Sequence, residues 1–179
     1  INEKASGRYD LLNRKTLDIH NLFFRITLEG GGIDRILSML SETINNPIIF
    51  VNEDWRLVDF TEHVNNKVPL SYCLDLVKNR TAFSNEFIDS IPKDVSEIKK
   101  TIKRIYYLEG MEIKCRILPV AAASSIYGYI IVWETVRELA EFDFIILEQA
   151  STNIALERIK AKEIEGVKLK IRQDFFDDL

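Results

Sequence analysis

The apolar positions at the start of the chain follow a helical repeat. Within residues 8–28 they recur at intervals of seven, four and three, at Leu12, Ile19, Phe23 and Ile26. This spacing places them on one stripe of an α-helix. Three consecutive glycines follow at residues 30–32, and because glycine readily adopts positive φ, they predict a hinge. We therefore expect residues 1–28 to form an N-terminal helix that is joined by this hinge to a separate domain.

The middle of the chain, residues 29–135, changes from a helical pattern to strand patterns. A helical stripe covers residues 33–44 and stops at Asn45-Asn46-Pro47. Five β-rich runs follow, at residues 48–51, 55–60, 101–109, 111–119 and 126–134. The first two predict a hairpin and the last three a meander, separated by an excursion over residues 61–100 with short helices near 71–78 and 83–91. This order predicts an α/β (α+β) fold, with an antiparallel sheet of five to six strands flanked by helices.

The last part of the chain, residues 136–179, has the composition of one long helix. It contains no proline and one glycine, and it is rich in Glu, Lys, Leu, Ile and Ala. At 1.5 Å per residue such a helix reaches about 60 Å, which is longer than a small domain is wide. Its apolar residues lie close to a heptad seam: Leu147, Ala150, Ile154, Ala161, Ile164, Ile171 and Phe175. A helix that outruns its domain must bury its stripe elsewhere, so we expect a homodimer through the terminal helices.

Two segments carry a resemblance to a family of bacterial regulators. They are Glu29-Gly30-Gly31-Gly32-Ile33-Asp34-Arg35-Ile36-Leu37 through Asn46-Pro47-Ile48-Ile49-Phe50-Val51-Asn52, and the tail from Ala155-Leu156-Glu157-Arg158 to Arg172-Gln173-Asp174-Phe175-Phe176-Asp177-Asp178-Leu179. They resemble the opening and the exit helix of GAF-like sensor domains in PucR/CdaR-type transcriptional regulators. The resemblance covers most of residues 29–179 and consists of patterns of apolar and small residues. It implies a GAF-like sensor domain at 29–135 and a signalling helix at 136–179.

The resemblance implies a ligand-sensing and dimerisation function. A small-molecule effector would bind between the sheet and the excursion, and the terminal helices would pass the change to a DNA-binding output. No helix-turn-helix pattern occurs in the sequence, so DNA contact would belong to segments beyond Leu179. Two alternatives stay open: a GAF- or PAS-type sensor domain of another signalling protein, and a module that dimerises without a ligand.

The composition of the chain limits the kinds of molecule that it is expected to bind. The net charge of −4 and the isoelectric point near 5.3 disfavour direct binding of nucleic acid, because such surfaces carry an excess of Lys and Arg. Cys73 and Cys115 have neither metal-ligand spacing nor a disulfide framework, so we expect reduced core thiols. The longest apolar runs, 126–133 and 142–147, are shorter than the roughly 20 residues of a membrane helix, and no leader pattern precedes them. We expect a cytoplasmic protein without membrane contact.

The candidate chemistry disfavours an enzyme. His20 and His63 are the only histidines, and neither lies in a nucleophile or metal-ligand pattern. The glycines at 30–32 lack the Lys-Ser/Thr of a phosphate loop, and carboxylate pairs such as Glu53-Asp54 lie in turns. We therefore expect no enzyme activity, no catalytic residue, no metal and no cofactor.

The candidate ligand-binding residues are polar or aromatic side chains on or near the sheet: His63, Tyr72, Arg104, Tyr106 and Arg116. His63 lies in the excursion, which borders the expected pocket. An inward-facing Arg104 or Arg116 would require an anionic ligand or a partner carboxylate. The alternation along the strands does not tell which face of the sheet carries them, and an exposed edge strand is the alternative. For Tyr72 and Tyr106, the alternative is packing as core aromatics.

Overall fold

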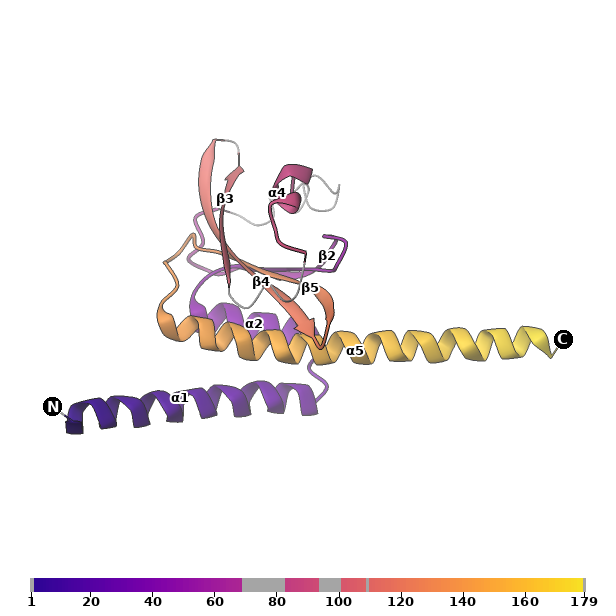
Figure 1. Ribbon diagram of the computed structural model, residues 1–179, viewed down its shortest axis with the longest axis horizontal. Helices are drawn as coiled ribbons and strands as arrows, with labels where there is room; N and C mark the ends of the chain where they lie inside the picture. The colour runs from indigo at the N-terminus through magenta and orange to yellow at the C-terminus, as the bar shows by residue number, and fades with distance from the viewer. Residues whose placement is uncertain (1, 69–82, 94–100, 109, 179) are drawn as a thin grey trace.

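The computed structural model describes residues 2–68, 83–93, 101–108 and 110–178. At its centre is an antiparallel sheet of five strands in the order β2-β1-β5-β4-β3 (Figure 1). The strands are β1 (Ile48–Val51), β2 (Leu57–Thr61), β3 (Ile102–Leu108), β4 (Met111–Ala122) and β5 (Ser125–Trp133). The predicted mixed α/β fold, with an antiparallel sheet and long helices at both ends of the chain, is therefore confirmed.

Strand β1 lies inside the sheet, between β2 and β5. Ile48 pairs with Val132 and Val51 pairs with Tyr129, and all residues of β1 are buried. A continuous apolar run of this kind suits a strand that is covered on both faces. The edge strand β2 is half-buried except for the exposed Val58, and the edge strand β3 alternates between half-buried and exposed residues over 102–107.

Strand β5 comes unusually close to β1 at Gly128. A Cβ atom at this residue would collide with the carbonyl oxygen of Val51, and the φ angle of Gly128 is +143°. Glycine tolerates both conditions because it lacks a Cβ. The β4–β5 pairing has a bulge beside this point, and the neighbouring side chains separate: Tyr127 packs on the helix side of the sheet and Tyr129 on the other.

Three helices lie on one side of the sheet (Figure 1). They are α1 (Asn2–Leu28), α2 (Gly32–Ile44) and α5 (Glu141–Asp177). Their apolar residues join the sheet in an aliphatic core that includes Phe23, Ile36, Leu37, Leu40, Ile130, Leu147 and Ile154. The predicted hinge is the turn between α1 and α2, and α2 ends where the sequence indicated, with Asn45 in the left-handed region at φ 52°.

Helix α5 begins at Glu141, later than the sequence suggested, because residues 134–140 form a linker after β5. With 37 residues it is about 55 Å long. Its first half is part of the domain core, and the seam residues Leu147, Ala150 and Ile154 are buried there. From residue 160 onward every described residue of the helix is exposed, and this half extends beyond the sheet in Figure 1.

The turn between β1 and β2 is longer than the sequence indicated. Trp55 was expected in the second strand, but its φ angle of 60° places it in the turn, and β2 begins at Leu57. The reason is the side chain of Asn52, whose Oδ1 accepts hydrogen bonds from the backbone N–H groups of Asp54 at 3.0 Å and Arg56 at 2.8 Å.

The opposite side of the sheet carries the short helix α4 (Asn85–Asp89). Ser84 caps it, since its Oγ accepts a hydrogen bond from the backbone N–H of Phe87. The sequence placed a helix near this point, at residues 83–91. The other short helix that it indicated, at 71–78, lies outside the described residues.

Candidate functional site

Six aromatic residues form a cluster on the side of the sheet away from α1, α2 and α5. This aromatic cluster consists of Trp55, Phe83, Phe87, Tyr106, Tyr129 and Trp133. The ring of Trp55 stacks on Tyr129 of β5 with centroids 4.5 Å apart. Tyr106 of β3 stacks on Trp133 of β5 at 6.2 Å and meets Phe87 of α4 edge-on at 5.7 Å. Segments that are far apart in the sequence therefore converge on this face.

Alternation along two strands explains why this face is apolar. Ile113, Cys115 and Ile117 of β4 and Ile131 of β5 are buried beneath the aromatic cluster. Burial raises the pKa of the Cys115 thiol to about 12, so this thiol stays neutral. Burial also raises the pKa of Tyr129. The face therefore favours uncharged and aromatic groups.

The indole N–H of Trp133 is a buried donor in the aromatic cluster. Trp133 is 2% exposed, and within the described part of the chain its indole Nε1 makes no hydrogen bond. A buried N–H group without an acceptor costs free energy compared with a satisfied one. The indole is therefore a donor that an acceptor atom of a small molecule would satisfy.

Arg104 and Tyr106 both lie on this face. Tyr106 is a member of the aromatic cluster, and Arg104 is aligned with Cys115 and, one strand further, with Trp133. The guanidinium of Arg104 donates hydrogen bonds to Oγ of Ser90 at 3.1 Å and to the carbonyl oxygen of Ser90 at 2.5 Å. It thereby connects β3 to the chain that follows α4.

His63 lies in the loop after β2, where its Nδ1 accepts a hydrogen bond from the backbone N–H of Asn65 at 3.2 Å. It is not among the residues that pack in the aromatic cluster. Tyr72 lies outside the described residues.

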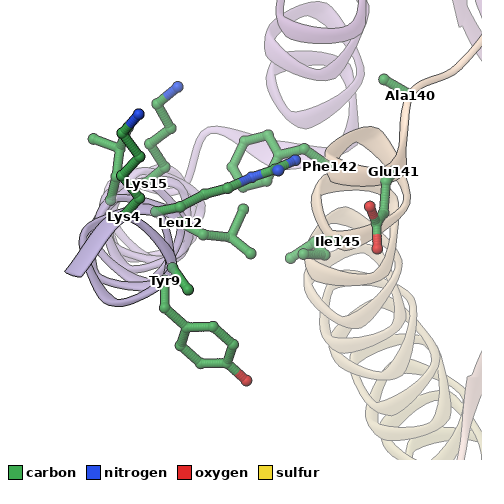
Figure 2. Close-up of a pocket in the computed structure, with 11 residues that line it drawn as sticks. Lys4, Tyr9, Leu12, Lys15, Ala140, Glu141, Phe142 and Ile145 are labelled. Carbon is green, nitrogen blue, oxygen red and sulfur yellow. The ribbon is translucent and has the colours of Figure 1, made fainter. Parts of the chain in front are cut away.

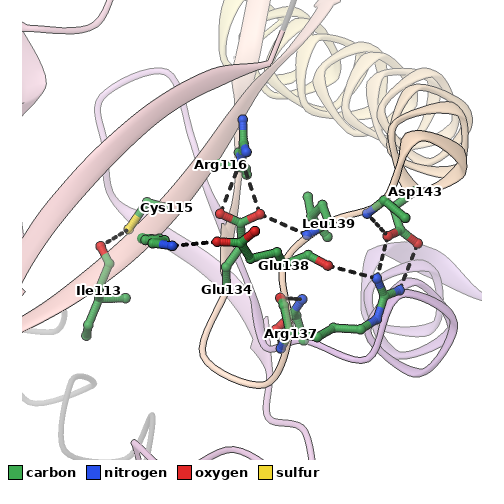
Figure 3. A network of polar contacts seen from close by, with 11 residues as sticks. Ile113, Cys115, Arg116, Glu134, Arg137, Glu138, Leu139 and Asp143 are labelled. Atoms are coloured by element: carbon green, nitrogen blue, oxygen red, sulfur yellow. Dashed lines mark hydrogen bonds and ion pairs between the residues drawn. The ribbon is translucent and has the colours of Figure 1, made fainter.

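Arg116 faces the opposite side of the sheet from Arg104. It pairs in register with Val132, a residue of the aliphatic core. Its Nε lies 3.2 Å from a carboxylate oxygen of Glu134, whose side chain is 1% exposed (Figure 3). The guanidinium also lies 5.6 Å from the ring centroid of Phe144 on α5. From the sequence, an inward-facing arginine was expected to need either an anionic ligand or a partner carboxylate. For Arg116 the structure provides the carboxylate, which is that of Glu134.

A groove of about 770 Å³ separates the N-terminal half of α1 from the first turns of α5 (Figure 2). Further along, α1 is held against α5, where His20 Nδ1 lies 2.9 Å from Gln149 Oε1 and Thr27 donates to Asn153 at 3.0 Å. The groove is lined by apolar and basic side chains, among them Lys4, Arg8, Leu11, Leu12, Lys15, Phe142 and Ile145. It is therefore an uncovered amphipathic surface on the helical side of the domain.

Neither a metal-ion site nor a membrane-spanning helix is present in the described part of the chain. There, no group of three or more His, Cys, Asp or Glu side chains is placed to hold a metal ion. None of the helices in the same residues combines the length and the apolar character that crossing a membrane requires.

No protein-family model and no curated protein matches the sequence. Among solved structures, the chain is similar to the crystal structure of the GAF domain from Acinetobacter phosphoenolpyruvate-protein phosphotransferase, with a TM-score of 0.52 and 13% sequence identity over 83% of this chain and 95% of that one. The fold is GAF-like. At 13% identity this similarity shows the fold alone.

In this GAF-like domain, the linker of residues 134–140 joins the sheet to α5 and is bonded to both (Figure 3). Glu134, which holds Arg116, also accepts a hydrogen bond from the backbone N–H of Leu139 at 2.9 Å. The carboxylate of Asp143 accepts from both terminal nitrogens of Arg137, at 2.6 and 2.9 Å, and from the backbone N–H of Ala140 at 2.6 Å. This hydrogen bonding raises the pKa of Arg137. The start of α5 is therefore capped by Asp143 from inside the helix.

Asn46 holds the middle of the same linker. It is fully buried, its Oδ1 accepts from the backbone N–H groups of Val136 at 3.1 Å and Arg137 at 3.3 Å, and its Nδ2 donates to the carbonyl oxygen of Arg137 at 2.9 Å. From the sequence, Asn46 was interpreted only as part of a helix stop. No pattern in the sequence indicated its contacts with the linker, because its partners Val136 and Arg137 lie about ninety residues away.

Proposed function

We propose that this GAF-like domain senses a small molecule and dimerises as part of a PucR/CdaR-type transcriptional regulator. DNA binding would belong to segments beyond Leu179, and the regulator would act in the cytoplasm. The observation that carries the proposal is the division of α5. Its first half is packed into the domain core, while Ile164, Ile171 and Phe175 further along are 56, 63 and 65% exposed. A helix that is packed into the domain core at one end and exposed at the other can transmit a change in core packing to a partner that binds the exposed end.

The effector would bind at the aromatic cluster, against the excursion of residues 61–100. Small-molecule sites are mostly apolar and contain a few polar groups that orient the ligand. Tyr106 would contribute a ring face, the free N–H of Trp133 would donate to an acceptor atom, and Arg104 would exchange its hydrogen bonds with Ser90 for those with an anionic group. A planar acid meets these requirements.

Dimerisation would use the terminal helices of two chains. Large apolar side chains are exposed along α1 as well as along α5, including Tyr9, Leu11, Leu17, Phe24, Ile164, Val167 and Ile171. Exposed apolar surface of this extent marks interaction sites in soluble proteins. The groove between α1 and the first turns of α5 adds further uncovered apolar side chains, among them Leu11, Leu12 and Ile145.

A thermal-stability screen of the whole chain tests the ligand. The compounds would be purine-derived acids, sugar diacids and other small anions, and a ligand at 100 times its Kd would raise the Tm by about 5–10 °C. Arg104→Gln should remove the shift. Lys103→Gln is the matched control, because Lys103 is exposed and points to the other face of the same strand. A shift that survives Arg104→Gln and Tyr106→Ala would place the ligand elsewhere.

A module that dimerises without a ligand is the second candidate. It is favoured by the contacts within the aromatic cluster, where the described rings already fill one another's faces. Concentration-dependent dimerisation without a response to any compound would support it. A sensor domain of another signalling protein is the third candidate, and the sequence that follows residue 179 in the parent gene distinguishes it from the first.

A further inference from the structure

The turn between β1 and β2 has an unusual conformation. Trp55 has a φ of 60°, which is rare for a bulky side chain and costs free energy. Its backbone N–H donates to the carbonyl oxygen of Asn52 at 3.0 Å, and the backbone N–H of Asn52 donates to the carbonyl oxygen of Arg56 at 2.8 Å. With the two bonds to the Asn52 side chain, these contacts tie the whole turn together. The conformation of the turn is therefore fixed by hydrogen bonds within the turn itself.

One side of this turn faces the aromatic cluster. The ring of Trp55 stacks on Tyr129 and meets Phe83 and Phe87 edge-on, at centroid distances of 5.7 and 6.2 Å. Aromatic pairs at such distances contribute beyond the area they bury. In the described part of the chain, the ring contacts of Trp55 are with these residues and none is with α5. The ring therefore anchors the turn to the face where we place the ligand.

The other side of the turn holds α5. The carboxylate of Glu53 lies 2.8 Å from Nζ of Lys162 and 3.7 Å from a terminal nitrogen of Arg158. We call these two ion pairs the Glu53 clamp. Burial opposes ionisation of Glu53, but the hydrogen bond from Lys162 and the charge of Arg158 outweigh it and lower the pKa of Glu53. The ammonium of Lys162 lies in addition 5.1 Å from the ring centroid of Tyr127 on β5.

The Glu53 clamp contacts α5 where the helix changes from buried to exposed. Arg158 is half-buried, while Lys162 is exposed like every described residue from 160 onward. The clamp therefore grips the helix at the boundary between the half that belongs to the core and the half that extends beyond it. A change there alters how the exposed half leaves the domain.

We propose that the β1–β2 turn couples the aromatic cluster to α5: the ring of Trp55 sets the position of the turn, and Glu53 transmits that position to Arg158 and Lys162. The direction toward an output rests on the proposed sensor function, but the coupling itself needs no ligand. A molecule that displaces the Trp55 ring would loosen the clamp, and a molecule that orders the ring would tighten it. Because a coupling free energy is reciprocal, breaking the ion pairs of the Glu53 clamp makes the Trp55 ring easier to displace by the same amount of free energy.

Amide hydrogen exchange on the full chain tests the coupling. Glu53→Gln removes both ion pairs, and exchange in residues 156–164 should rise about threefold to tenfold. Trp55→Asn should produce a rise of similar size in the same residues. Asparagine tolerates the left-handed backbone of the turn, so this substitution removes the ring without forcing the turn open. Asp54→Asn is the matched control, because Asp54 lies in the same turn and makes no ion pair in the described structure.

The double variant distinguishes coupling from two separate effects. If the ring acts on α5 through Glu53, adding Trp55→Asn to Glu53→Gln should leave the exchange in residues 156–164 unchanged. Additive effects would overturn the proposal. So would a Trp55→Asn variant that folds but leaves this part of α5 unaffected, since the clamp would then hold the helix without reading the aromatic cluster.

A second measurement places the tested substitutions on α5, outside the aromatic cluster. With 5-fluorotryptophan incorporated, the fluorine resonance of Trp55 is identified by its loss in Trp55→Phe. Lys162→Gln and Arg158→Gln, both on α5, should shift this resonance or change its width, whereas Asp54→Asn should not. An unchanged Trp55 resonance in both α5 variants would overturn the coupling, even if the ligand screen succeeds.

Discussion

The two halves of helix α5 carry similar apolar residues in opposite environments. In the first half Ile146, Leu147 and Ile154 are at most 2% exposed, whereas Ile164, Val167 and Ile171 in the second half are 56 to 63% exposed. The helix is continuous, so local propensity does not separate them. What separates them is the neighbouring structure, since β4 and α2 lie beside the first half alone. An apolar stripe thus shows that a helix needs a partner surface, without showing which one.

The largest expected effect is in the buried half. Leu147→Ala removes a fully buried side chain from the aliphatic core and should lower the free energy of unfolding by about 2–5 kcal/mol. Leu169→Ala makes the same chemical change where the side chain is 61% exposed, and should cost about 0.5 kcal/mol or less. Urea denaturation of both variants at low protein concentration measures the difference. Equal losses would mean that the second half is packed against the domain as well.

A smaller loss is expected where the buried half begins. Asp143→Asn keeps the shape of the side chain but removes the charge that holds Arg137 and caps α5, so unfolding should become easier by about 1–3 kcal/mol. The same denaturation experiment measures it. Glu141→Gln is the control, because Glu141 is an exposed acid in the same helical turn. If Glu141→Gln lowered the free energy of unfolding equally, the effect would come from the interaction of any acidic charge with the helix dipole and not from the contacts of Asp143.

The exposed half should matter for association rather than for folding. Ile171→Glu places a charge on the heptad seam, and a dimer formed through this seam should weaken about 10- to 100-fold. Gln173→Glu adds the same charge two residues away, off the seam, and should have little effect. Sedimentation equilibrium over a range of concentrations gives both dissociation constants. A wild-type chain that stays monomeric at high concentration would contradict a shared helix altogether.

The smallest effect is expected at Gly166, within the exposed half. A Cβ atom at this position meets nothing within 4 Å, so Gly166→Ala should stabilise the helix locally by about 0.5–1 kcal/mol. Hydrogen exchange near residue 166 should slow, while exchange at Leu147 should not change. A weaker dimer in this variant would indicate that the partner chain approaches the backbone at this glycine.

Much of the fold could be predicted from the sequence because its signals are local. The strand at residues 48–51 is a short apolar run after a proline, and α2 stops at an asparagine that accepts the left-handed conformation. The long helix after residue 140 follows from composition. The linker was missed because no local pattern marks it: its conformation depends on Asn46 and Glu134, whose partners lie in other segments.

The candidate site was predictable only in part. Tyr106 was singled out as aromatic, and it lies in the aromatic cluster, but Arg104 and Arg116 were indistinguishable in the sequence. They lie on opposite faces of the sheet, because β3 and β4 pair in a register that aligns Arg104 with Cys115 and not with Arg116. The role of Glu53 was hidden for a similar reason. Acidic residues are common in turns, and its basic partners are more than a hundred residues away.

Patterns along the chain predicted most of the described helices and strands, the place of the glycine turn, and a last helix that extends beyond its domain. These features depend on neighbouring residues along the chain, through periodicity, backbone preference and composition. Only the tertiary structure decided which face of the sheet each arginine occupies, which half of α5 is buried, and that Glu53 meets Lys162. Those outcomes depend on strand register and on contacts between distant segments, and a period-two or heptad pattern is compatible with more than one of them.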